Sequence, residues 1–411
     1  MKPFLIGGLI CVIGFSNTAY SNPAAPFLER LYDAAMAHPS VKLANLNREK
    51  SNLDFEAAQW SKYPSVSVDG ARSLESDGAV TFRVEQPLWT AGRTDALINV
   101  ARTEIDVAQA EIEEARQAIK LEVGLAYADM FRSQLKLSIA DSNIEELSRL
   151  SQVIARRVAQ EVSAEAEQLL VDARLEQAKA ERQMLNGQFM AAQTRLYEAT
   201  NMDVLGVSPL ECGAELELTE SVLVEQALNQ SPTLDRLGES MRVAQSEVNV
   251  ARSERFPKLV LGLERLSDAS LTAEVDESVY LGFQYQLSDG FSINSRIASA
   301  EKSIQTASFD RKVASDALKR EVRLSFQEHK ASQAQLVPLM ALVDANQGLI
   351  ASYLRQYRVG KKSWLDVVNA QREVAQSQQT LADIKGTLCS SVIKLGLLSN
   401  NLFVSELEEK S

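Results

Sequence analysis

Residues that commonly carry out chemistry are scarce in this sequence. It has two histidines, His38 and His329, and three cysteines, Cys11, Cys212 and Cys389. His38 precedes a proline at a predicted helix end and His329 lies in a long polar segment, so neither has partners at the spacing of a metal site. No nucleophile–base pair, phosphate loop or metal cluster is recognisable. We therefore predict no enzyme activity, no cofactor and no metal site.

Charge and the N-terminus narrow the class of protein. The 411 residues include 43 Lys and Arg against 55 Asp and Glu, a formal charge of −12, which argues against a nucleic-acid partner. Lys2, an apolar run over 3–15 and small or polar residues over 16–21 predict a secretory signal peptide cleaved after Ser21. In an oxidising compartment Cys212 and Cys389 could pair, although their spacing does not require it.

The chain carries an internal duplication. LYDAAMAHP at 31–39 is similar to VEQALNQSP at 224–232, and Tyr63-Pro64 recurs as Phe256-Pro257 193 positions later. Residues 122–127 and 321–326 share the pattern Glu-Val-x-Leu-x-Tyr/Phe, 199 positions apart. Each copy is far longer than a solenoid repeat, so we predict a duplicated domain.

Each copy contains two segments with period-2 alternation. We predict strands at about 65–74 and 79–88 in the first copy, and at about 258–266 and 278–287 in the second. About ten residues is also the length of a tilted membrane-crossing strand. The hydrophilic faces of these strands carry Ser65, Ser67, Asp69, Thr81, Arg83, Glu85, Glu264, Gln284 and Gln286. Two ordinary soluble hairpins are the alternative.

Beyond each pair of strands the period changes to that of a coiled coil. The 3,4 spacing begins Ile98, Ala101, Ile105, Ala108 and continues to Ile119, and its second copy is interrupted only by Arg311. Long proline-free stretches support long helices. A helix over about 93–158 would be roughly 100 Å long and would need other helices packed along it.

Four strands cannot close a membrane barrel, because single-chain barrels have at least about eight strands and an open edge in lipid leaves backbone groups unpaired. Strands in a membrane would therefore require several copies of the chain around one watery lumen, extended by a tube of helices. Such an assembly is a conduit.

The order of elements, the duplication and several motifs resemble the TolC family of outer-membrane export channels. The motifs are Ala34-Ala35-x-x-His38-Pro39, Tyr63-Pro64, Gln86-Pro87-Leu88-Trp89-Thr90-Ala91-Gly92-Arg93, and the segment from Tyr357 to Val368. The resemblance implies a mainly helical protomer with a small β part, forming a homotrimer with a 12-stranded outer-membrane β-barrel. It also implies a periplasmic helical barrel that docks to an adaptor (membrane fusion protein) and an inner-membrane ABC or RND pump.

By this resemblance the ends of the helical hairpins, at about 156–164 and 356–364, dock the adaptor and close the channel. Candidate docking and gating residues are Val158, Glu161, Arg355, Arg358, Val359, Gly360 and Lys361. Val359-Gly360 matches the family's Val-Gly pair, whereas Lys361 stands where the family often has a hydrophobic residue. The second tip is basic, and the first is followed by Glu161, Glu165 and Glu167. We hypothesise that these opposite charges meet across neighbouring hairpins and hold the entrance closed.

The predicted organisation is a signal peptide (1–21), a first TolC-like repeat (22–205), a connector (206–220), a second repeat (221–400) and a tail (401–411). The predicted function is an exit duct in the outer membrane of a Gram-negative bacterium, for type I secretion or multidrug efflux. The alternatives are a periplasmic adaptor and a coiled-coil scaffold.

Overall fold

We describe a computed structural model of the chain. The structure describes residues 27–71, 79–207, 212, 219–268, 276–285 and 292–399. The predicted signal peptide, the C-terminal tail and most of the predicted connector lie outside these residues.

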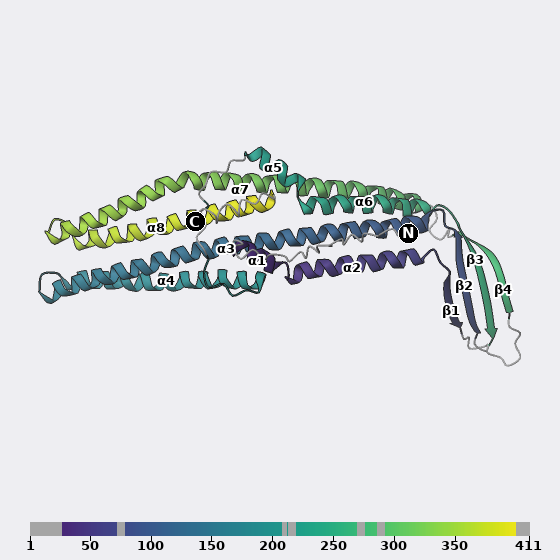
Figure 1. The fold of residues 1–411 in the computed structure, drawn as a ribbon, viewed down its shortest axis with the longest axis horizontal. Coiled ribbons are helices and arrows are strands. Elements are labelled where there is room, and N and C mark those ends of the chain that lie inside the picture. The colour runs from purple at the N-terminus through teal and green to yellow at the C-terminus, as the bar shows by residue number, and fades with distance from the viewer. Residues whose placement is uncertain are drawn as a thin grey trace, which may run out of the picture.

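The same order of elements occurs twice (Figure 1). The first half contains α1 (Phe27–Ala35), α2 (Pro39–Trp60), β1 (Ser65–Ala71), β2 (Ala79–Trp89), α3 (Arg93–Ala159) and α4 (Glu165–Thr200). The second contains α5 (Glu220–Asn229), α6 (Pro232–Ser253), β3 (Lys258–Asp268), β4 (Asp276–Gln284), α7 (Ser292–Arg358) and α8 (Trp364–Leu398). The expected long helix from residue 93 is therefore confirmed, and α7 continues through Pro338.

The predicted strands are confirmed, with shifted ends. β3 extends to Asp268, two residues beyond the prediction, and β4 begins at Asp276 and ends at Gln284. Residues 72–74 and 286–287, predicted as strand ends, fall outside the described residues. The strands form an antiparallel sheet in the order β1-β2-β3-β4, and a register irregularity at Pro87 and Trp89 ends the β2–β3 pairing.

The helices form a long rod with the sheet at one end and the two hairpin tips at the other (Figure 1). Beside the sheet the packing order is α2-α3-α6-α7, whereas towards the tips α3 packs on α4 and α8, and α7 on α8. The coiled-coil pattern explains this arrangement, because Ala101, Ala108, Ile112 and Ile119 are buried along α3. Arg311, which interrupts the second copy, instead donates from Nε to the carbonyl oxygen of Leu234 in α6 at 3.2 Å.

Two large apolar clusters hold the rod together. The middle core contains Tyr127, Met130, Leu196, Leu388 and Ile393, and joins α1, α3, α4 and α8. The tip core lies near the hairpin ends and consists of Leu147, Leu150, Ile154, Val171, Ala178, Tyr357, Trp364, Val367 and Val368. Both hairpins contribute to both clusters, so the two repeats share their cores.

Candidate functional site at the helical tips and the sheet

The two hairpin tips have the same backbone turn although their sequences differ. In the second tip Gly360 adopts a φ of 74°, and the N–H of Lys361 donates to the carbonyl of Gln356 at 2.9 Å. In the first tip Glu161 adopts a φ of 57°, and the N–H of Val162 donates to the carbonyl of Arg157 at 2.9 Å. Both α3 and α7 are thus followed by a residue in the left-handed conformation and by a 6→1 backbone hydrogen bond, as in a Schellman motif. Glu161 occupies the position of glycine, where a side chain is unfavourable.

The helices that leave the tips begin differently. The Ser363 hydroxyl accepts from the Asp366 N–H and the Asp366 carboxylate accepts from the Ser363 N–H, which forms a capping box at the start of α8. The hydrogen bonds from Ser363 lower the pKa of Asp366. The N-cap residue of α4 is Ala164, whose side chain makes no capping hydrogen bond. The second tip is therefore the better fixed of the two.

The tips of the two hairpins contact each other through Tyr357. The Arg157 guanidinium lies 4.9 Å from the centroid of the Tyr357 ring, and the Ser163 and Tyr357 hydroxyls are 3.3 Å apart. The Tyr357 ring also lies 5.0 Å from that of Trp364, which is 1% exposed. Arg157 and Ser163 belong to the first hairpin and Tyr357 and Trp364 to the second, so these contacts join the hairpins at the end of the rod.

The predicted gating residues occupy different environments. Val158 is half-buried against the tip core, whereas Glu161, Arg355, Arg358, Val359, Gly360 and Lys361 are exposed. Among the residues that the structure describes, no ion pair joins Glu161, Glu165 or Glu167 of the first hairpin to the basic residues of the second tip within one protomer. The ammonium of Lys362 instead lies 4.4 Å from the Tyr353 ring centroid and 3.9 Å from the Asp366 carboxylate.

The sheet has one apolar and one polar face. The register places Val68, Phe82, Leu261, Leu281 and their alternating neighbours on one face, where the large apolar side chains are largely exposed. The opposite face carries the predicted hydrophilic set: Ser65, Ser67, Asp69, Thr81, Arg83, Glu85, Glu264 and Gln284. Gln286 lies outside the described residues.

A polar network crosses the hydrophilic face. Arg83 donates from Nε to Glu264 at 3.1 Å, and the Tyr280 hydroxyl donates to Glu85 at 2.9 Å. The Tyr280 ring lies over Gly262, where an added Cβ would overlap the ring. Water can solvate these groups. The opposite face is mainly apolar, and its charged side chains are Arg265 and Glu277, which form an ion pair at 3.3 Å at the end of the sheet away from the helices.

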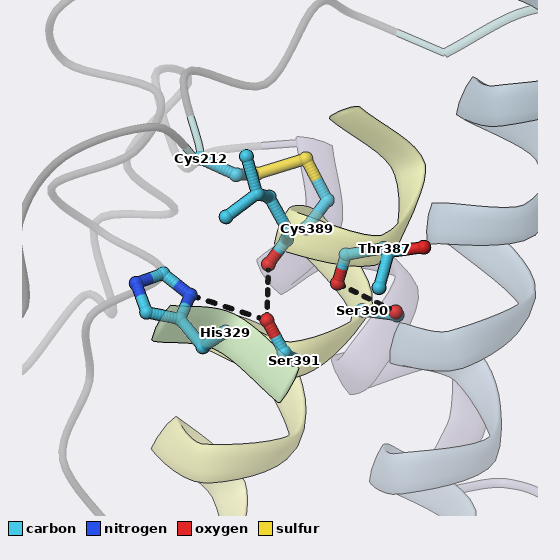
Figure 2. Close-up of a disulfide and its surroundings, with 7 residues drawn as sticks. Cys212, His329, Thr387, Cys389, Ser390 and Ser391 are labelled. Atoms are coloured by element: carbon cyan, nitrogen blue, oxygen red, sulfur yellow. Dashed lines mark hydrogen bonds between the residues drawn. A yellow bond between two sulfur atoms is a disulfide. The ribbon is translucent and has the colours of Figure 1, made fainter. Parts of the chain in front are cut away.

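A disulfide joins Cys212 of the predicted connector to Cys389 of α8 (Figure 2). Both cysteines are buried in the middle core. Nearby, His329 of α7 is 1% exposed and its Nδ1 lies 3.2 Å from the Ser391 hydroxyl. Burial, with a smaller contribution from Lys330, lowers the pKa of His329. The sequence left the cysteine pairing open, and it gave no signal for the contact between His329 and Ser391, which lie 62 residues apart.

Other chemistry is not assembled in the described residues. No group of three or more His, Cys, Asp or Glu side chains there is placed to hold a metal ion. Across the same ranges no helix combines the length and apolar character that a membrane-spanning helix needs. Two surfaces stand out in the described residues, the tips and the two-faced sheet, at opposite ends of the helical rod (Figure 1).

A long helical rod that carries a two-faced sheet at one end is the architecture of a channel protomer. The sequence model of the outer membrane efflux protein family matches residues 31–202 and 223–401. The chain belongs to this family, whose members are transport channels, and the resemblance to TolC-like proteins is confirmed.

Individual relatives are distant in sequence. The chain is 26% identical over 314 residues to the cobalt-zinc-cadmium resistance protein CzcC of Cupriavidus metallidurans, covering 72% of this chain and 71% of CzcC. It is 23% identical over 323 residues to protein CyaE of Bordetella pertussis, covering 71% and 68%. Among solved structures, the alignment with CusC covers 90% of this chain and 91% of the CusC chain, with a TM-score of 0.77 and 14% sequence identity. The Campylobacter jejuni channel CmeC covers 90% and 85% with a TM-score of 0.76 at 14% identity.

Proposed function

We propose that the protein is the outer-membrane exit duct of a tripartite export system, working as a homotrimer. Three copies would join their sheets into a 12-stranded barrel and their helices into a periplasmic tube. Cargo, a protein or a small molecule, passes from an inner-membrane ABC or RND pump and a periplasmic adaptor to the exterior, in type I secretion or multidrug efflux. Membership of the outer membrane efflux protein family supports this proposal.

The observation that carries the proposal is the sheet. Its apolar face is exposed, with Val279 at 72% and Phe283 at 71%, and lipid is the solvent that suits such a face. β1 and β4 are edge strands, and edges are not tolerated in lipid. Further copies of the chain would pair these edges and place the polar face around water.

The helices at the two edges of the layer beside the sheet also expose apolar side chains that a second copy could cover. In the layer beside the sheet α2 and α7 lie at opposite edges. Large apolar side chains are exposed on both: Leu43, Leu46 and Leu53 on α2, and Phe309 and Val313 on α7. Burial of these side chains against a second copy would be favourable.

Membrane fractionation of cells that express the whole chain tests this function. The protein should sediment with outer membranes and run as a trimer on unheated gels and as a monomer after boiling. A periplasmic adaptor would instead fractionate with the inner membrane, and a coiled-coil scaffold would be found in the soluble fraction. Either of these results would refute the duct.

At the tips we propose that the basic residues Arg355, Arg358 and Lys361 meet Glu161 and its acidic neighbours on an adjacent protomer and hold the entrance closed. Val158, Val359 and Gly360 would shape the surface that the adaptor contacts. Because exposed ion pairs contribute only about 0–1 kcal/mol each, the closed state requires their repetition around the trimer.

Charge reversal tests the proposed gate. Arg355→Glu with Arg358→Glu should raise single-channel conductance, and further reversal of Glu161 to Lys should lower it again. Arg372→Glu, an exposed change on α8 away from the tips, is the matched control. Unchanged conductance in the double variant would exclude the gate.

A further inference from the structure

A band of positive charge surrounds the junction between the sheet and the helices. We define this junction band as four described segments at which α2, α3, α6 and α7 approach the sheet, namely residues 57–64, 90–96, 250–258 and 292–296; the link from β4 to α7 is not part of it. It contains six basic residues (Lys62, Arg93, Arg252, Arg255, Lys258 and Arg296) and two acidic ones (Asp95 and Glu254). The whole chain has the opposite balance, 43 basic against 55 acidic residues.

Part of the band is repeated by the internal duplication. Lys62-Tyr63-Pro64 follows α2 and Arg255-Phe256-Pro257 follows α6, and each leads directly into a strand. The turns are equivalent, because Tyr63 donates from its N–H to Trp60 at 3.0 Å and Phe256 to Ser253 at 3.2 Å. Each repeat therefore has one corner in which a cation and an aromatic residue are adjacent.

The aromatic members of these corners are unusually open to solvent. Tyr63 is 58% exposed and Phe256 is 55% exposed, although neither residue type favours water. Trp60 is 69% exposed and its ring centroid lies 5.1 Å from that of Tyr63. Rings placed this way suit the boundary between hydrocarbon and water.

The cations of the corners keep donors available. Lys62 pairs with Asp95 at 2.8 Å, but both side chains are more than half exposed. One terminal nitrogen of Arg255 donates to the Asn294 side chain at 3.0 Å, and within the described part of the chain no ion pair involves Arg255 or Lys258. The acid Glu254 is shared between Arg93 and Arg296. Arg252 pairs with Glu301 of α7 at 2.8 Å. Among the described residues, the cations of the band that no acid pairs with are therefore Arg255 and Lys258, and Lys62 has only its solvent-exposed pair with Asp95.

The corners lie where the apolar face of the sheet begins. Val66 follows the first corner by two residues and Leu259 follows the second by two, and both side chains belong to the apolar face. Along the chain the order is cation, aromatic ring, apolar strand. Anionic headgroup, interface and hydrocarbon follow one another in the same order at a membrane surface.

We propose that the corners Lys62-Tyr63 and Arg255-Phe256 bind the phosphate groups of anionic glycerophospholipids in the leaflet on the helical side of the membrane. The proposal rests on the membrane insertion described under the proposed function and adds a lipid preference to it. A trimer would present six corners, two from each protomer, around the base of its barrel. The lipid contacts would fix the depth of the barrel in the bilayer.

Lipid retention by the purified whole protein tests this preference. The trimer is extracted from vesicles with equal amounts of phosphatidylglycerol and phosphatidylcholine, and the bound lipids are counted by native mass spectrometry. Wild type should retain more phosphatidylglycerol than phosphatidylcholine, and each removed cation should weaken the preference about fivefold. Lys62→Gln with Arg255→Gln should therefore weaken it about 25-fold, whereas Lys62→Arg with Arg255→Lys should preserve it.

The control is Arg149→Gln with Arg242→Gln, which removes two exposed cations outside the junction band and should leave the preference unchanged. Inorganic phosphate at the same concentration as the lipid should not displace the bound phosphatidylglycerol. Equal retention of the two lipids by wild type, or an unchanged preference in Lys62→Gln with Arg255→Gln, would overturn the proposal while leaving the duct intact. A chain that enters no vesicle at all would overturn both.

Discussion

The disulfide between Cys212 and Cys389 allows a quantitative test of how the two repeats are held together. Cys212 comes from the segment between the repeats and Cys389 from the last helix, so the bond closes a loop with a sequence separation of 177. The segment is also attached to the first hairpin, because Gln193 of α4 donates to the Val204 carbonyl at 2.6 Å and the Val207 N–H donates to Gln134 of α3 at 3.0 Å. The bond thus connects the second repeat to a segment anchored on the first.

The expected loss follows from chain entropy. Releasing a loop of 177 residues gives the unfolded chain freedom equivalent to about 5 kcal/mol at 25 °C. At about 2.1 cal/mol/K per residue, a chain of 411 residues has an unfolding entropy of about 0.9 kcal/mol/K. Removal of the bond should therefore lower the melting temperature by about 6 °C.

Differential scanning calorimetry of the detergent-solubilised protein measures this shift in Cys212→Ala with Cys389→Ala. Each single variant also breaks the bond, so each should lose nearly as much as the double variant. If the two single losses instead sum to the loss of the double variant, side-chain packing is responsible. Melting of the double variant within about 1 °C of wild type would refute the entropic reasoning.

Three further changes test the account elsewhere. Burial lowers the pKa of His329, so as the pH decreases below 6.5 the unfolded chain takes up a proton that the folded chain does not. The urea concentration at the unfolding midpoint should therefore decrease as the pH is lowered through this range, and His329→Gln should make that decrease smaller. Gly124→Ala should destabilise the protein by about 1–3 kcal/mol in urea unfolding, because an added Cβ would lie 2.5 Å from the Ile393 side chain; a neutral result would mean that α3 and α8 are less closely packed. Glu161→Gly should raise stability by about 1 kcal/mol, because it relieves a left-handed non-glycine residue, and no gain in the melting temperature would contradict this interpretation.

Much of the fold can be predicted from local patterns. The alternation in 79–88 fixes the faces of β2, and the 3,4 spacing from Ile98 fixes the buried side of α3, because both depend only on neighbours along one element. The start of α3 is marked by Gly92, whose φ of 80° ends the preceding turn. Because the second repeat has the same order of elements, the faces of its strands and the buried side of its long helix can be predicted in the same way.

The contacts that local patterns could not supply are tertiary. Cys212 and Cys389 could be recognised as a possible pair, but only the packing of α8 beside the connector brings them together. The link between Arg157 and Tyr357 depends on the lateral position of two hairpins whose tips are about 200 residues apart. The turn at Glu161 was hidden because a residue other than glycine occupies the left-handed position.

Conductance of the purified protein in planar lipid bilayers is the most direct test of the central claim that this chain forms a water-filled duct. The trimer should insert with uniform current steps, and Arg355→Glu with Arg358→Glu should enlarge them. A protein that remains monomeric in detergent, or that binds bilayers without producing discrete current steps, would contradict the account.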